Sequence, residues 1–174
     1  MSDTLARWNR MPVFEAEQEI LPCCGSRAWA QAVVSRRPIA EEAMLLAVSD
    51  EIWRSLKNSD WMEAFRSHPR IGESRPQKNA ETIGDARSRN WSAREQSEVA
   101  ETEESLRNAL AEGNREYERR FGRTFIICAS GKGAHEILNV LRQRLQNDSS
   151  TELLEASEQQ RQITHIRLKK WLTE

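Results

Sequence analysis

One histidine of this chain lies in a sequence context that suits acid–base chemistry. His68 occurs in AFRSHPRIGES, residues 64–74, where Pro69 follows it and Gly72 comes three residues later. Proline fixes the backbone direction after the histidine, and glycine allows another group to approach closely. The flanking charges, which could tune an imidazole near neutral pH, come from Arg66, Arg70 and Glu73. A histidine at a helix C-terminus is also often only a favourable dipole partner, so that alternative stays open.

A second stretch, SAREQ at residues 92–96, has two interpretations. Ser92 and Glu95 have the spacing of a capping box, which predicts a helix N-terminus at Ser92, and the pattern alone favours this interpretation. Free amides at a helix N-terminus would also form an anion site. A carboxylate there would keep its charge and accept hydrogen bonds from a substrate N–H. The two interpretations do not exclude each other.

The other polar residues are weaker candidates. His135 is expected on the surface, and His165 lies on the last predicted helix with Arg161 and Arg167 near it. A solvent-exposed helix face explains three glutamates, Glu101, Glu103 and Glu104. The chain contains no HExxH spacing, G-x-S-x-G elbow or phosphate-binding loop, so we expect no metal site. The cysteines form no CxxC pair, which predicts reduced thiols in a cytosolic protein for Cys23, Cys24 and Cys128.

Helices must position these residues. Ser26 can cap a helix over 26–37 that Pro38 ends, and a second helix is predicted over 40–57. A short helix then leads to His68, where Pro69 ends it.

Residues 72–91 are polar and weakly periodic, which predicts a long loop. A long helix is expected over 92–121, with Gly122 as its left-handed cap. Its apolar face comprises Val99, Leu106, Leu110, Tyr117 and Phe121. The run TFIICAS, residues 124–130, is expected to be a buried extended connector. Two further helices are predicted over 133–146 and 151–172, the last with Leu154, Ile163, Ile166 and Trp171 inward.

The composition of the chain limits which fold classes and which kinds of partner are expected. The chain has 174 residues, a net charge of −1, 7 glycines and 5 prolines. Its abundant helix-forming residues predict one compact all-α domain of about seven to nine helices over residues 14–174, after a flexible lead-in over 1–13. The near-zero charge supplies no basic field for nucleic acid. No apolar run reaches the roughly 18 residues of a membrane span, and we expect neither a membrane partner nor a signal peptide.

Together these motifs resemble the 2-oxo-4-hydroxy-4-carboxy-5-ureidoimidazoline (OHCU) decarboxylase family of the uricase pathway. The His-Pro-x-x-Gly and Ser-x-x-Glu-Gln elements, in this order and spacing, are fairly specific. The resemblance covers about Phe14 to Leu172, through CCGSRAW, DWMEAFRSHPRIGE, SAREQ, NREYERRFGRTFIIC and LRQRLQNDSSTELLEASEQQRQITHIRL.

The resemblance implies an all-helical homodimer that forms (S)-allantoin and carbon dioxide without a cofactor, and the cysteines separately predict a cytoplasmic location. It implies His68 as the catalytic histidine and Glu95 as its catalytic partner. Implied substrate contacts are Pro69, Ser92, Gln96 and Arg167. The backbone of one segment is also implied to hold the substrate, at Phe125, Ile126, Ile127, Cys128 and Ala129. Arg123 is a departure, because relatives usually have an aromatic or apolar residue there.

Two rival functions stay open at this stage. One is a helical interaction module whose His-Pro turn is only a structural corner. The other is a different lyase or hydrolase of ureido compounds in the same pathway. The product formed from the unstable uricase product would discriminate between them.

Overall fold

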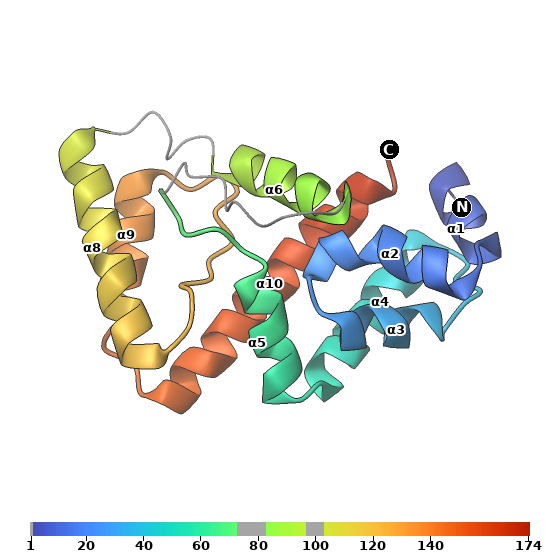
Figure 1. Cartoon of the computed structure of the whole chain (residues 1–174), viewed down its shortest axis with the longest axis horizontal. Helices are drawn as coiled ribbons and strands as arrows, with labels where there is room; N and C mark the ends of the chain where they lie inside the picture. Colours follow the sequence, from blue (N-terminus) through green and yellow to red (C-terminus); the bar gives the residue numbers. More distant parts are fainter. Residues whose placement is uncertain (1, 73–82, 97–102) are drawn as a thin grey trace. The chain divides into compact units, whose positions relative to one another are not determined.

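The computed structural model describes residues 2–72, 83–96 and 103–174 (Figure 1). Nine helices and no strand lie in these residues, which confirms the all-α class and the expected number of helices. The chain divides into two compact units: unit 1 is Met1–Ala64 with Arg161–Glu174, and unit 2 is Phe65–Gln160. A single domain over 14–174 stays a prediction. None of the described helices combines the length and the hydropathy that a membrane crossing needs.

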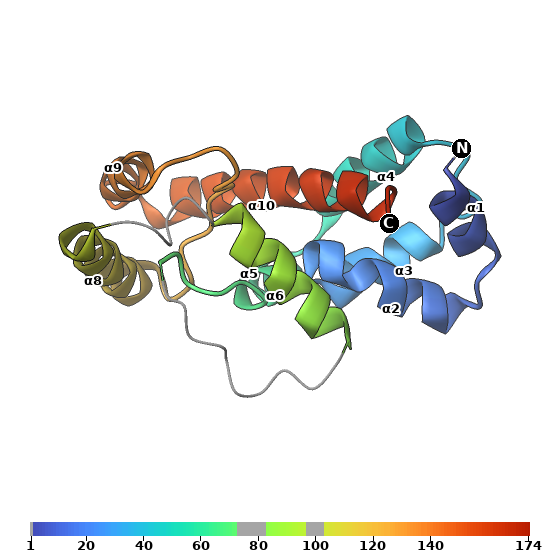
Figure 2. The same ribbon diagram turned by 90° about the horizontal axis from the view of Figure 1, so that it is seen from above.

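Unit 1 is a set of short helices. They are α1 (Asp3–Arg10), α2 (Val13–Cys24), α3 (Arg27–Val34), α4 (Glu42–Ser55), most of α5 (Asn58–Arg66) and the end of α10 (Ser149–Trp171). Helix α3 packs against both α2 and α4 (Figures 1 and 2). The predicted cap at Ser26 is confirmed, because its hydroxyl accepts a hydrogen bond from the Trp29 N–H at 3.3 Å. This cap satisfies one of the free amides at the start of α3.

The prediction of a loose lead-in is wrong for residues 3–10, which form α1. Leu5 and Trp8 are buried, and the Trp8 indole N–H donates to the Ala16 carbonyl at 3.0 Å. A single tryptophan and a single leucine are too few to establish a period in the sequence, but burial of both is enough to hold the helix. Helix α2 was also not predicted, because Pro22 lies in its last turn.

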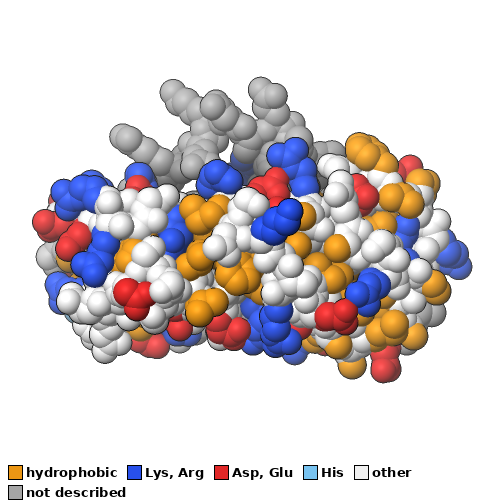
Figure 3. Space-filling model, turned by 90° about the horizontal axis from the view of Figure 1, so that it is seen from below, with side chains coloured by type: hydrophobic (Ala, Val, Ile, Leu, Met, Phe, Trp, Pro, Cys, Tyr) orange, Lys and Arg blue, Asp and Glu red, His pale blue; other side chains and the backbone are white. Residues whose placement is uncertain are grey.

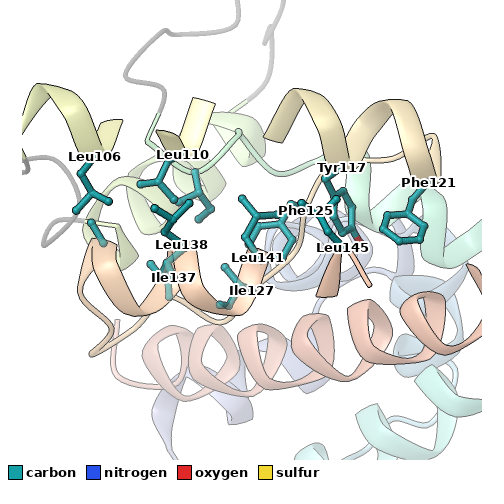
Figure 4. Packing of buried hydrophobic residues seen from close by; sticks show 13 residues of the cluster. Leu106, Leu110, Tyr117, Phe121, Phe125, Ile127, Ile137, Leu138, Leu141 and Leu145 are labelled. Atoms are coloured by element: carbon teal, nitrogen blue, oxygen red, sulfur yellow. The ribbon is translucent and has the colours of Figure 1, made fainter. Parts of the chain in front are cut away.

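Unit 2 is built around the pair α8 (Glu104–Phe121) and α9 (Ala134–Arg144), with α6 (Ile83–Glu95) and the start of α10. Helices α8 and α9 lie side by side (Figures 1 and 2), and apolar side chains fill the space between them (Figure 4). This core comprises Ile71, Leu106, Leu110, Tyr117, Phe121, Phe125, Ile127, Ala129, Ala134, Ile137, Leu138, Leu141 and Leu145.

The region around SAREQ differs from its prediction. Ser92 does not begin a helix but lies in the last turn of α6, which ends at Glu95. The loop expected over 72–91 is helical from Ile83 onward, whereas residues 73–82 and 97–102, with Glu73, Val99 and Glu101, lie outside the described residues. Helix α6 was not predicted, because its polar sequence contains too few apolar residues to show a helical period.

The helix predicted over 92–121 is confirmed only from Glu104, where α8 begins. The predictions for the chain after this helix hold with one exception. Gly122 ends α8 in the left-handed region at φ 66°, and a buried connector follows it. Leu154 was expected inward but is 61% exposed, whereas Ile163 is buried. The two residues are nine positions apart, which is about two and a half helical turns, so they lie on opposite faces of α10.

One face of the molecule shows charged side chains of both signs among apolar ones (Figure 3). This mixture agrees with the net charge of −1. Large apolar side chains that are exposed include Val13 and Phe14 at the start of α2.

Candidate functional site

The turn that follows α5 carries the candidate histidine. We name residues 68–72 the His-Pro turn. His68 is buried, with 9% of its surface exposed, and its N–H donates to the Phe65 carbonyl at 3.2 Å. Gly72 has φ 80°, in the left-handed region where a side chain would be strained. The predicted helix end at the His-Pro step is therefore confirmed, and the glycine is required by the backbone itself.

Helix α8 holds this turn through two polar side chains. The buried Asn114 donates its side-chain amide hydrogen to the Ile71 carbonyl at 2.9 Å. Arg70 forms a two-pronged ion pair with Glu118, with both N–O distances at 2.6 Å. The first contact satisfies a buried carbonyl, and the second fixes the turn at the surface of α8.

A hydrogen bond joins the two sequence motifs. The Gly72 N–H donates to the Gln96 side-chain oxygen at 3.4 Å, which brings the end of α6 to the His-Pro turn. Ser92 is buried, whereas Glu95 and Gln96 are partly exposed. The structure thus brings Gly72 of HPRIG and Gln96 of SAREQ together.

The capping-box interpretation of Ser92 and Glu95 is wrong. Both residues lie in the last turn of α6, where the helix presents carbonyl groups and not free amides. The helix N-terminal anion site that we expected there is therefore absent from this part of α6. A carboxylate at a helix C-terminus is unfavourable with respect to the helix dipole. Glu95 consequently gains nothing from its place in the helix, and a structural cap does not explain it.

The residues FIICA, 125–129, named here the FIICA segment, run between α8 and α9. Phe125, Ile127 and Ala129 belong to the core between these helices (Figure 4), whereas Ile126 and Cys128 are buried outside that core. Such alternation is typical of an extended chain. Three of the five side chains are therefore enclosed in the core, and the polar groups that the segment can offer a ligand are those of its backbone.

Two side chains form hydrogen bonds with the backbone of the FIICA segment. Arg144 of α9 donates to the Ile126 carbonyl at 2.6 Å. The Gln159 side-chain oxygen, on α10, accepts from the Cys128 N–H at 2.9 Å. Arg144 is itself paired with the buried Glu152 at 2.6 Å.

The polar residues that bind the turn and the segment were not predicted, although their spacing within apolar helix faces could have identified them. Asn114 lies four residues after Leu110, on the same apolar face of α8. Arg144 lies three residues after Leu141 on the apolar face of α9. A polar residue that interrupts an apolar stripe at helical spacing must find a partner when it is buried.

Arg123, the departure from the family pattern, lies at the edge of this core. Its guanidinium donates to the Phe121 and Ser149 carbonyls at 3.5 and 3.4 Å and also covers the Phe121 ring. The arginine therefore packs through its stem and its cation–π contact where an apolar side chain would otherwise lie.

The remaining candidates lie in unit 1 or at the surface. Arg167 is fully buried in unit 1 and donates to the Pro22 carbonyl at 3.4 Å. His165 lies 2.7 Å from the Asp50 carboxylate, which also accepts from Arg161 at 3.1 Å. This cluster is an ion-pair network between α4 and α10 that the sequence did not reveal. His135 is exposed, as predicted.

The three cysteines are buried, and no disulfide joins them. Burial raises the pKa of Cys24 to about 12, so its thiol stays protonated and unreactive at neutral pH. In the parts of the chain that the structure describes, no group of three or more His, Cys, Asp and Glu side chains could hold a metal ion.

Comparisons with known proteins identify the family. The family model "OHCU decarboxylase" matches residues 9–169. This chain belongs to the OHCU decarboxylase family. The resemblance that the two motifs indicated is therefore confirmed over nearly the whole sequence.

Two curated relatives are uric acid degradation proteins. The "Uric acid degradation bifunctional protein TTL" of Arabidopsis thaliana is 32% identical over 154 residues, covering 88% of this chain and 46% of that protein. The "Uric acid degradation bifunctional protein" of Bacillus sp. (strain TB-90) is 25% identical over 141 residues, covering 80% and 26%. This OHCU decarboxylase family chain thus spans less than half the length of these relatives.

Two solved structures share the fold. A crystal structure of OHCU decarboxylase in the presence of (S)-allantoin is 32% identical, with a TM-score of 0.76 over 90% of this chain and 99% of that one. A crystal structure of (S)-allantoin synthase is 18% identical, with a TM-score of 0.70 over 96% and 53%. The first match extends over the whole length of a family member, whereas the second shows the fold alone.

Proposed function

We propose that this chain decarboxylates OHCU to (S)-allantoin and carbon dioxide in urate degradation. Its family and its similarity to an OHCU decarboxylase over 99% of that chain support the activity. The observation that carries the proposal is the hydrogen bond from Gly72 to Gln96, which brings the His-Pro turn and the end of α6 together. These are the two elements from which the motifs predicted the catalytic residues.

The reaction needs no cofactor because the substrate supplies its own electron sink. The bond between C4 and the carboxylate carbon breaks, and its electron pair forms a C4–C5 double bond. The C5=N pair moves onto the ring nitrogen, which takes up a proton. C5 is then protonated on one face while the C4 hydroxyl loses its proton and becomes a carbonyl, and the ring nitrogen keeps the proton that it took up. One carbon–carbon bond is replaced by one carbon–hydrogen bond, with net uptake of one proton.

His68 is the group that delivers this proton. Imidazole exchanges protons readily near neutral pH, which suits a step that needs one positioned acid–base group. Pro69 and the left-handed Gly72 fix the backbone around it. Delivery from a fixed imidazole reaches only one face of C5, which accounts for a single enantiomer as product.

Other groups orient the substrate. The Glu95 carboxylate accepts hydrogen bonds from the ureido and ring N–H groups, without help from helix amides. The backbone of the FIICA segment supplies donors and acceptors for the ring. Further contacts come from Pro69, Ser92 and Gln96, and the contact that the resemblance implied for Arg167 stays a prediction. Holding the reacting bond in one orientation removes much of the entropic barrier.

The test is a spectroscopic assay of the product. The unstable uricase product is converted enzymatically to OHCU immediately before the chain is added, and circular dichroism follows the formation of allantoin. We expect fast formation of the S enantiomer, whereas the uncatalysed control gives slow, racemic product. Decay at the uncatalysed rate, or a racemic product, contradicts the proposal. Feeding the preceding intermediate separates this activity from that of an earlier hydrolase.

We also propose that the chain works as a cytoplasmic homodimer. The exposed Val13 and Phe14 at the start of α2 supply apolar surface for a second copy, and the cysteines without disulfides suit a reducing compartment. Sedimentation velocity at assay concentrations should give a dimer mass, and a monomer would contradict this assembly. Immunodetection in fractionated source cells tests the location.

A further inference from the structure

The backbone of the FIICA segment is held on one edge. In an extended chain, the peptide groups of alternate residues point to the same edge. Arg144 binds the carbonyl of Ile126, and Gln159 binds the N–H of Cys128, two residues further on. Both hydrogen bonds therefore act on one edge, and the N–H and C=O of Ile127 point to the other.

Arg144 is itself fixed by buried partners. Its Nε and Nη2 donate to one Glu152 oxygen at 3.0 and 2.6 Å, and its guanidinium lies 4.6 Å from the Phe125 ring centre. Glu152 also accepts hydrogen bonds from the Tyr117 hydroxyl and the Asn147 amide. A planar guanidinium with this many contacts has one orientation available, so the donor to the Ile126 carbonyl is aimed in advance.

We propose that Arg144 and Gln159 are positioning residues that align the free edge of the FIICA segment for the substrate. They touch neither the substrate nor the reacting atoms, and they act through the backbone of Ile126 and Cys128. The Ile127 peptide groups at the opposite edge are those that pair with the amide groups of the ureidoimidazoline ring. This inference rests on the proposed function, because it assigns a role within that reaction.

Loss of this alignment has a definite kinetic signature. The ring amide groups that the Ile127 peptide binds lie outside the bond changes at C4, C5 and the imine nitrogen, so these contacts contribute equally to ground-state and transition-state binding. Removal of such uniform binding raises KM and leaves kcat unchanged. A purely structural role would lower the amount of folded enzyme and its melting temperature, but it would not move KM.

The half-buried Gln159 offers the cleanest variants. Gln159→Leu removes the acceptor for the Cys128 N–H, whereas Gln159→Glu keeps an oxygen there. Because the Gln159 amide also donates to Glu155 at 3.0 Å, both variants are made and compared in a Glu155→Gln background, in which the new carboxylate has no like charge beside it. We expect Gln159→Leu to raise KM roughly 3- to 10-fold, the effect of one net hydrogen bond, with kcat nearly unchanged. Gln159→Glu should restore a KM close to that of the wild type. Gln143→Leu, at an exposed position of α9, is the matched control and should change neither constant.

Arg144→Lys tests the other contact. Lysine keeps the charge beside Glu152 but lacks the planar fork that binds Glu152 and the Ile126 carbonyl together. We expect the same rise in KM, with some loss of melting temperature. Arg123→Lys is the control, because Arg123 is also buried but binds the carbonyls of Phe121 and Ser149, outside the segment. It should lower the melting temperature and leave KM unchanged.

The outcomes separate this inference from the proposed function. A wild-type chain that forms no (S)-allantoin overturns the function. An active wild type whose KM is unchanged in folded Gln159→Leu overturns the positioning role alone, as does a KM that Gln159→Glu fails to restore. If Arg144→Lys does not fold, the two Gln159 variants still decide the question.

Discussion

The His-Pro turn and the FIICA segment are two irregular stretches of unit 2 that are held in different ways. The turn has one core side chain, Ile71, and depends on single polar contacts from Asn114, Glu118 and Gln96. The FIICA segment has three core side chains and a buried ion pair behind it. In the proposed mechanism the turn therefore supplies a side chain, whereas the segment supplies its backbone.

The largest loss of activity should come from a substitution in the His-Pro turn. His68→Asn keeps a polar side chain of similar size but removes acid–base exchange, so we expect activity to fall about 10²–10⁴-fold with the melting temperature nearly unchanged. Rates of (S)-allantoin formation and thermal unfolding curves measure both quantities. A folded variant with near-normal turnover would show that the turn is only a structural corner.

Substitution of Glu95 should give the second-largest loss of activity. Because Glu95 lies at the C-terminal end of α6 and not among its N-terminal amides, Glu95→Gln and Glu95→Ala should both leave stability within about 0.5 kcal/mol. Each should lower turnover by about 10²-fold through misorientation of the substrate. Paired melting and activity measurements check this expectation. Full activity of Glu95→Gln would remove the carboxylate from the mechanism.

Asn114 tests how the turn is held. Asn114→Ala leaves the Ile71 carbonyl buried without its donor, and we expect a loss of about 1–3 kcal/mol in unfolding free energy. Turnover should fall as well, because His68 precedes this carbonyl by three residues. Urea denaturation and initial rates measure the two effects. Loss of stability with unchanged kcat would separate the contact from the chemistry.

The network behind the FIICA segment should be sensitive to alkali. Burial, and then the hydrogen bond to Glu152, raise the pKa of Tyr117 above the ordinary value of 10.0 for a tyrosine. A phenol whose pKa is raised by folding contributes stability that is present below pH 10 and is lost as the pH rises further. Tyr117→Phe should therefore be less stable than the wild type at pH 8 but lose less stability between pH 9 and 11. Parallel slopes in urea denaturation would contradict this.

Removal of the partly exposed ion pair between Arg70 and Glu118 should have the smallest effect on stability. Arg70 and Glu118 are partly exposed, with side-chain exposures of 42% and 26%. Arg70→Ala is expected to cost about 0.2–1 kcal/mol, less at high salt, because solvent screens such pairs. Denaturation at low and high ionic strength checks this. A loss above that of Asn114→Ala would reverse the order of the two contacts that hold the turn.

Local patterns in the sequence determined most of the helices and the motif residues. The cap at Ser26, the glycine at 122 and the break at Pro69 each depend on the backbone preferences of one or two residues, so the sequence alone predicted them. The apolar stripe of α8 was predicted for the same reason, since a helical period needs only local spacing.

Only the tertiary structure decided where Ser92 and Glu95 lie in their helix, because the capping-box spacing fits any helical turn. It also decided which polar residues hold the site. Arg144, Glu152 and Asn114 interrupt apolar stripes, but their partners lie in other elements: the Ile126 carbonyl, the Tyr117 hydroxyl and the Ile71 carbonyl. A local pattern shows that a buried polar group needs a partner, and only the packing of distant segments determines which group that partner is.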